Sequence, residues 1–272
     1  VEGVQLLFHI DGTVVYRHCR DDPIGQAGDQ RCDFGIGGLA IQPGDLLAAL
    51  AHGLGEFAQA FAKAGCVVLA TDINTAGAEE TAALIKADGG KAHAHAVDVT
   101  ATQSCRALAE FAEAQMGGVD VLINNAGGLV NRPYNMLTRE DFMTMAQVNW
   151  IGPALWIQSL ESLFAPGAHI VNISSMGGFQ GASKYPGLAA YASSKAALVG
   201  LTECLQAEWG DRGWTFNALC LGAVQTEMLA EAFPGYVAPT TPETMGNYLA
   251  HFGLTGHETY AGAVLPVTKS NP

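Results

Sequence analysis

The chain has 272 residues, of which 49% are hydrophobic and 14% charged, and its formal net charge is −13. This composition supports one large folded domain and excludes a disordered chain. The acidic balance argues against nucleic acid or an anionic membrane surface as the partner, and no apolar run reaches the ~18 residues that cross a bilayer. Six cysteines and eight histidines lack metal-ligand spacing, so we expect free thiols, no bound metal and a reducing cytoplasm.

The sequence indicates no role for the start of the chain. Residues 1–44 carry proline and glycine at irregular spacing, and Pro43 makes the next residues a poor buried strand because proline lacks a ladder donor. Residues 1–44 are therefore set apart from a catalytic domain at 45–272. They are either an extension that folds over the sheet or an altered reading of the start of the gene. Gly53 and Gly55 precede a helical run, which by itself is a weak signal in a chain with 33 glycines.

The middle of the chain alternates strands and helices. Strands are expected at residues 66–71, 91–99, 120–124, 168–173, 215–220 and 264–267, and helices at 78–88, 103–116 and 189–209. A further long helix opens at Thr138, an N-cap with Asp141 three residues on, and should bend at Gly152 and Pro153. Repeated βα units of this kind predict an α/β fold, a doubly wound parallel sheet with helices on both faces.

Small and polar residues close two of the predicted strands. Asn125, Ala126 and Gly127 follow the strand at 120–124, and Ser175 follows the strand at 168–173. The carboxyl ends of parallel strands line the ligand crevice of an open α/β sheet. We therefore expect these side chains to lie at one site.

Tyr191 and Lys195 are four residues apart in the predicted helix 189–209, so both leave the same face one turn apart. An ammonium close to the phenol would lower its pKa and make Tyr191 a usable general acid and base. The plainer interpretation is a polar pair on a solvated helix face. The two strand ends that close with small and polar residues favour the catalytic interpretation.

The Asn-Asn-Ala-Gly strand end, the later serine and Tyr-x-x-x-Lys occur in the order typical of one family. From about residue 53 to 266 the chain resembles the single-domain short-chain dehydrogenases/reductases. The resemblance implies a Rossmann-like fold and hydride transfer between a nicotinamide and a secondary alcohol or ketone, such as a sugar, a polyol or another hydroxy compound. It also implies that Tyr191 moves the proton, Lys195 tunes Tyr191 and bonds the nicotinamide ribose, Ser175 orients the substrate oxygen and Asn149 holds a water beside the lysine.

The resemblance also implies a dinucleotide site. Its residues would be Gly53, Gly55, Asp72, Asp98, Val99, Asn125, Ala126, Gly127, Tyr191, Lys195, Gly222 and Thr226. Asp72 would bond the ribose hydroxyls and repel a 2′-phosphate, which favours NAD over NADP, unless it is a plain turn aspartate. The family's turn begins with Thr-Gly, whereas this chain has Ala48 and Ala49. This departure leaves open an alternative function, in which the chain is a non-catalytic relative that senses a dinucleotide or acts as a scaffold.

Two further expectations concern the substrate and the assembly. Residues 227–251, rich in Met, Phe, Tyr and Pro, should cap the pocket, and the long loop within 177–188 should widen the cover over the substrate. In the family, the tyrosine helix and the helix before it pack against a neighbouring subunit. Apolar stripes that include Trp156, Leu160 and Leu198 favour a homotetramer here, with a dimer as the alternative.

Overall fold

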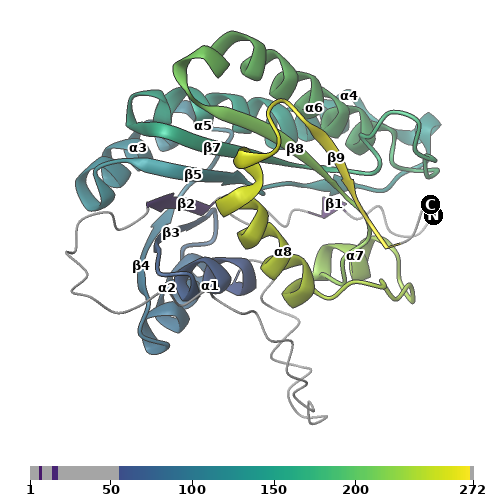
Figure 1. Ribbon diagram of the computed structural model, residues 1–272. Helices are drawn as coiled ribbons and strands as arrows, with labels where there is room; N and C mark the ends of the chain where they lie inside the picture. Colours follow the sequence, from purple (N-terminus) through teal and green to yellow (C-terminus); the bar gives the residue numbers. More distant parts are fainter. Residues whose placement is uncertain (1–5, 8–13, 18–54, 270–272) are drawn as a thin grey trace, which may run out of the picture.

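A seven-stranded sheet runs through the computed structural model, which describes residues 6–7, 14–17 and 55–269. The strand order is β4-β3-β2-β5-β7-β8-β9 (Figure 1). The strands are β2 Val14–Arg17, β3 Val67–Asp72, β4 Lys91–Ala96, β5 Val119–Asn124, β7 Phe164–Ser175, β8 Thr215–Leu221 and β9 Val264–Val267. The six strands predicted from the sequence are all confirmed, with ends that differ by a few residues.

The strand β2 departs from the parallel arrangement. It lies between β3 and β5 and pairs antiparallel with both, with Val14 opposite Ala70 on one side and Ile123 on the other. Strand β2 lies within residues 1–44, the segment set apart from the catalytic domain, and it was not predicted from the sequence. Its Val-Val-Tyr sequence suits a strand, and it pairs backbone groups of β3 and β5 that would otherwise need other partners. The expected strand near Pro43 lies outside the described residues.

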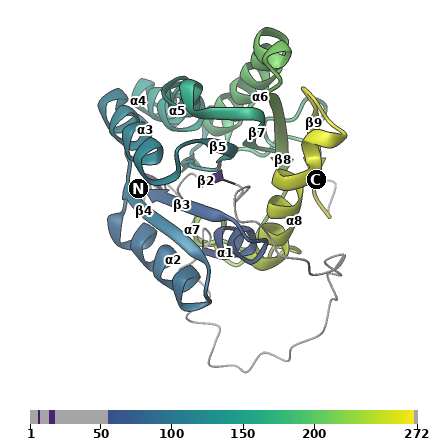
Figure 2. The same ribbon diagram turned by 60° about the vertical axis from the view of Figure 1, so that its left-hand side comes forward.

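Helices cover both faces of the sheet (Figures 1 and 2). On one face lie α1 Gly55–Lys63, α2 Thr75–Ala87 and α8 Pro242–Thr255, and on the other α3 Thr102–Met116, α5 Gly152–Leu160 and α6 Ala189–Trp209. Figure 2 shows β4 and β9 at opposite edges. This arrangement confirms the doubly wound α/β fold. Within the described ranges, no helix is long and apolar enough to cross a membrane.

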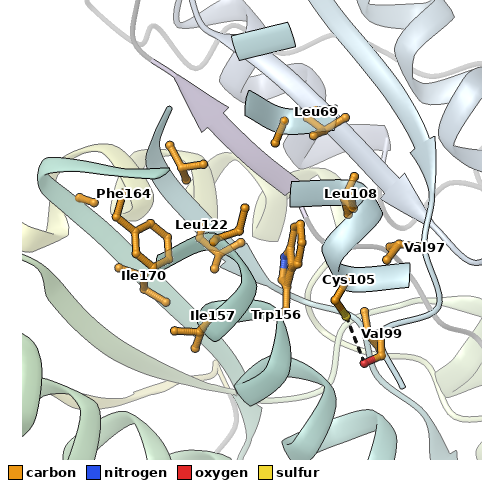
Figure 3. Close-up of a cluster of buried hydrophobic side chains, with 14 of the residues drawn as sticks. Leu69, Val97, Val99, Cys105, Leu108, Leu122, Trp156, Ile157, Phe164 and Ile170 are labelled. Carbon is orange, nitrogen blue, oxygen red and sulfur yellow. Dashed lines mark hydrogen bonds between the residues drawn. The ribbon is translucent and has the colours of Figure 1, made fainter. Parts of the chain in front are cut away.

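Each face has its own apolar core. The first is built around Phe61, Ile85 and Phe252, which come from α1, α2 and α8. The second surrounds Trp156, which is 1% exposed and packs with Leu108 and other side chains from α3, α5 and the sheet (Figure 3). Burial of this kind contributes about 25 cal/mol per Å² of apolar surface, so the two cores fix the sheet whose ends carry the site.

The long helix after Thr138 changes pitch before the predicted bend. It consists of α4 Arg139–Ala146, a π-helical turn Gln147–Ile151 and then α5. The predicted N-cap at Thr138 is confirmed and forms a capping box, because Thr138 Oγ1 accepts from Asp141 N and the Asp141 carboxylate accepts from Thr138 N. Gly152 follows the π turn, and a Cβ there would lie 3.0 Å from Val99 Cγ2. The wide turn carries Asn149 into the interior, where it is 0% exposed.

Candidate active site

A cavity of about 310 Å³ opens at the carboxyl ends of β5, β7 and β8. It lies beside α6 and the short helix α7 Glu227–Ala232. The predicted site residues that line it are Asn125, Gly127, Ser175, Tyr191, Lys195, Gly222 and Thr226. The expectation that these strand ends and the tyrosine helix meet at one place is confirmed.

Helix α6 brings Tyr191 and Lys195 to the cavity from its first two turns. Tyr191 is half-buried, and Lys195 is 4% exposed. The Lys195 ammonium donates to the carbonyl oxygen of Ile173 at 2.8 Å, which ties α6 to the end of β7. A Cβ added to Gly127 would lie 3.3 Å from Lys195 Nζ, so the ammonium also lies against the end of β5.

Burial shifts the pKa values of both groups. It raises the pKa of the Tyr191 phenol, and a hydrogen bond with the Ser175 side chain offsets part of that rise. It lowers the pKa of Lys195 to about 8, because the charged form loses its hydration. The expectation that Lys195 holds the Tyr191 pKa below its ordinary value is therefore wrong for this structure. Desolvation by burial is the largest cause of the rise in the Tyr191 pKa.

The two serines at the end of β7 have different partners. Ser175 bonds Tyr191, and its Oγ also accepts from Gly177 N at 3.1 Å. Ser174 Oγ donates to the carbonyl oxygen of Lys195 at 2.9 Å and so holds the helix to the strand. Gly178 then packs directly on α6, since a Cβ there would lie 2.7 Å from the carbonyl carbon of Lys195.

Asn149 does not line the cavity but lies behind the residues that do. Its Oδ1 accepts from Gly128 N at 2.8 Å, and its Nδ2 donates to Gly128 O at 2.9 Å and to Ser194 Oγ at 3.0 Å. Both amide hydrogens are thus used, one for the turn after β5 and one for α6. Asn149 joins the two elements that carry Gly127 and Lys195.

The remaining residues of the predicted dinucleotide site lie away from the cavity. Asp72 ends β3, is 8% exposed and accepts from Asn74 N at 2.7 Å, as a turn aspartate would. Asp98 accepts from the backbone and hydroxyl of Thr100 at 2.9 and 2.7 Å. Val99 is buried in the apolar core with its carbonyl oxygen accepting from Cys105 Sγ (Figure 3), so a ligand there would meet its backbone.

Three other predicted residues complete the list. Ala126 is buried in the same core as Val99, and Gly55 is buried at the start of α1. Gly53 lies outside the described residues. The missing Cβ atoms at Gly127 and Gly222 let Lys195 and Thr268 lie against the ends of β5 and β8, because a Cβ at Gly127 would lie 3.3 Å from Lys195 Nζ and one at Gly222 would clash with the Thr268 hydroxyl. The cavity of about 310 Å³ at this edge, lined by polar groups of Asn125, Lys195 and Thr226, fits a nicotinamide.

The cavity walls contain residues that motif reasoning missed. Leu129, from β6 Leu129–Val130, and Leu188, in the loop before α6, line it together with Phe233 after α7. Nothing distinguishes such leucines from core residues in a sequence. Phe233 falls in the expected capping segment 227–251, but α8, which forms much of that segment, packs on the sheet in the α1 core instead.

Comparisons with known proteins point to one family. A family model described as short chain dehydrogenase matches residues 46–236. The D-threitol dehydrogenase of Mycolicibacterium smegmatis is 33% identical over 193 residues, which are 70% of this chain and 73% of that protein. The 7alpha-hydroxysteroid dehydrogenase of Escherichia coli K12 is 33% identical over 202 residues, 72% of this chain and 73% of the relative.

A solved structure agrees with the sequence relatives. A 7α-hydroxysteroid dehydrogenase complexed with NADH and 7-oxo glycochenodeoxycholic acid superposes with a TM-score of 0.74 at 28% identity. The match covers 82% of this chain and 91% of that one. The likeness therefore extends over most of the fold, beyond the site motifs.

Proposed function

Because this chain belongs to the short-chain dehydrogenase/reductase family of oxidoreductases, we propose that it interconverts a secondary alcohol and its ketone with NAD. The observation that carries the proposal is the meeting of Ser175, Tyr191 and Lys195 at one cavity. A proton relay of this kind serves no purpose in a module that only binds a dinucleotide. The geometry therefore favours an enzyme over a sensing or scaffolding relative.

In this proposal Tyr191 gives a proton to the ketone oxygen and takes one back from the alcohol. A phenol has an ordinary pKa of about 10, which burial raises here, so Tyr191 carries the proton that the reducing direction needs. Ser175, already hydrogen-bonded to Tyr191, orients the same oxygen, and the Lys195 ammonium stabilises the phenolate left after proton donation. Asn149 keeps Lys195 and the β5 turn in place through its bonds to Gly128 and Ser194, and its contact with a water beside the lysine stays a prediction.

The family's enzymes bind nicotinamide dinucleotides, which supply or accept the hydride. Asn125, Gly127, Gly222 and Thr226 would hold the nicotinamide end at the cavity. Asp72 would face the ribose from the end of β3, which favours NAD over NADP because its carboxylate repels a 2′-phosphate. Competition between the two dinucleotides for the purified protein, followed by calorimetry, tests this preference.

The proposal also places the protein in a reducing cytoplasm. Cys66, Cys105, Cys204 and Cys220 are all free thiols, as expected in that compartment. Fractionation of the source cells, with detection of the chain in the cytoplasmic fraction, checks this point.

We further propose a homotetramer. Trp156, Leu160 and Leu198 from the predicted stripes are buried within the chain and cannot contribute to it. Other apolar side chains on the α4 segment are exposed, with Phe142 at 39% and Met143 at 47%. Exposed apolar surface on this segment supports assembly. Light scattering at micromolar concentration tests it, and a fully active monomer would contradict it.

Replacement of Tyr191 by Phe tests the catalytic proposal. Phe keeps the ring that packs with Leu129 and Leu188 but removes the hydroxyl, so the fold should survive. We expect kcat to fall by about 10²–10⁴-fold, the usual contribution of a positioned acid or base. Tyr248→Phe, on α8 and 39% exposed, is the matched control and should keep full activity. Full activity of Tyr191→Phe would refute the assignment.

A further inference from the structure

The cavity has a polar floor and apolar walls. Ser175, Tyr191 and Lys195 form the floor, and among the described residues that line the cavity Lys195 is the one charged side chain. The walls come from three separate segments. Their side chains are Leu129, Leu188, Met228, Leu229 and Phe233.

Several polar groups of the cavity already have partners within the protein. Ser174 donates to Lys195 O at 2.9 Å, and Lys195 Nζ donates to Ile173 O at 2.8 Å. Thr226 Oγ1 accepts from Leu229 N at 3.3 Å, as the N-cap of α7. A substrate with a hydroxyl on every carbon would therefore place most of its hydroxyl groups against Leu, Met and Phe side chains.

The rim of the cavity is aromatic. Tyr185 and Tyr236 line it and are 52% and 47% exposed, so their phenol groups can stay in contact with water. Tyr134 is 74% exposed and lines an adjoining hollow together with Tyr185. Aromatic rings at a wet boundary accept an apolar body below and a polar end above.

We propose that the substrate is a secondary alcohol or ketone on an apolar ring skeleton, with any further polar group confined to the end that reaches Tyr185 and Tyr236. This inference rests on the proposed dehydrogenase function and narrows its substrate to apolar alicyclic compounds, against polyols and sugars. Each methylene buried against the walls should improve kcat/KM by about fourfold. Each hydroxyl buried there without a hydrogen-bond partner should lower kcat/KM by about fivefold to 150-fold.

The first experiment compares substrates of two classes with the full chain and both NAD and NADP. Cyclohexanol and decahydro-2-naphthol form the apolar series, and threitol and galactitol form the polyol series. Four extra carbons set a ceiling of about 250-fold on the gain from cyclohexanol to decahydro-2-naphthol, and we expect at least about tenfold. Faster turnover of either polyol than of decahydro-2-naphthol would overturn the inference while leaving the dehydrogenase function intact. No turnover of any alcohol with either dinucleotide would refute the proposed function itself.

The second experiment changes one wall. Leu229→Asn keeps the branched shape and the number of side-chain heavy atoms but makes the wall polar, and Ala230→Ser is the matched control because Ala230 is exposed on the same helix and does not line the cavity. We expect Leu229→Asn to lower the ratio of kcat/KM for decahydro-2-naphthol over cyclohexanol by about tenfold, and Ala230→Ser to leave it unchanged.

A third variant covers the case in which Leu229→Asn does not fold, as judged by its thermal melt. Phe233→Leu keeps an apolar wall but removes the ring, and it should lower the same ratio by several-fold, in line with about fourfold for each lost carbon contact. An unchanged ratio in the folded wall variants would overturn the inference.

Discussion

Asn149 provides a sharp test of how the site is held together. In Asn149→Ala, the N–H and C=O of buried Gly128 lose their side-chain partners, which stand at 2.8 and 2.9 Å. Ser194 keeps a partner, because its hydroxyl also donates to Tyr191 O at 2.7 Å. At about 1–3 kcal/mol for each unsatisfied buried group, we expect a loss of about 4 kcal/mol. For a domain of this size that loss should lower Tm by roughly 8–16 °C.

Calorimetric melting of the purified variant measures this loss. Asn131→Ala is the matched control, because exposed Asn131 makes a single bond of 2.9 Å to Ala232 O and should cost about 1 kcal/mol or less. Since Gly127 lies against Lys195 Nζ, the refolded Asn149→Ala variant should also lose about tenfold or more in kcat/KM through misplacement of the ammonium. An Asn149→Ala protein that melts within the range of the control would refute the structural role.

Three further results are expected. Because the pKa of Lys195 is lowered to about 8, its positive charge is present below that pH and is lost above it, so kcat/KM for ketone reduction should fall above about pH 8. A kcat/KM that stays constant up to pH 10, or that falls in the same way in Lys195→Met, would contradict the role of the Lys195 charge. Asp72→Ala should narrow the ratio of NAD to NADP affinity measured by calorimetry, whereas a wild-type preference for NADP would show that Asp72 is only a turn residue. Gly178→Ala should reduce activity, because its Cβ would meet the α6 backbone at 2.7 Å. Gly200→Ala is the control, since its Cβ would meet nothing within 4 Å in the described part, and it should raise the free energy of unfolding by about 0.5–1 kcal/mol in a denaturant titration.

Local pattern was enough to predict most of the sheet and the tyrosine helix. Apolar runs closed by small polar residues mark β5 and β7, and helix α6 was predicted from residue 189 to 209 as observed. These features depend on hydrogen bonds within one segment and on side-chain alternation, which neighbouring residues determine. The four-residue spacing of Tyr191 and Lys195 then fixed their common approach to the cavity.

Pairing between distant segments could not be predicted in the same way. Strand β2 is four residues long, too short to show alternation, and its antiparallel place between β3 and β5 depends on partners that are distant in the sequence, such as Ala70 for Val14. The pKa of Tyr191 is a similar case. Spacing brought a lysine near it, but the depth of burial decided the direction of the shift.

The amino-acid sequence by itself determined the fold class and the order of the parallel strands, and it predicted the residues that we propose move a proton. The tertiary structure decided that Asn149 binds the Gly128 backbone and that Leu129, Leu188 and Phe233 form walls of one cavity. The physical reason is that an apolar side chain carries the same sequence signal in a core and in a cavity wall. Which of the two it becomes depends on whether packed segments leave a space beside it, and that space is a property of the assembled chain.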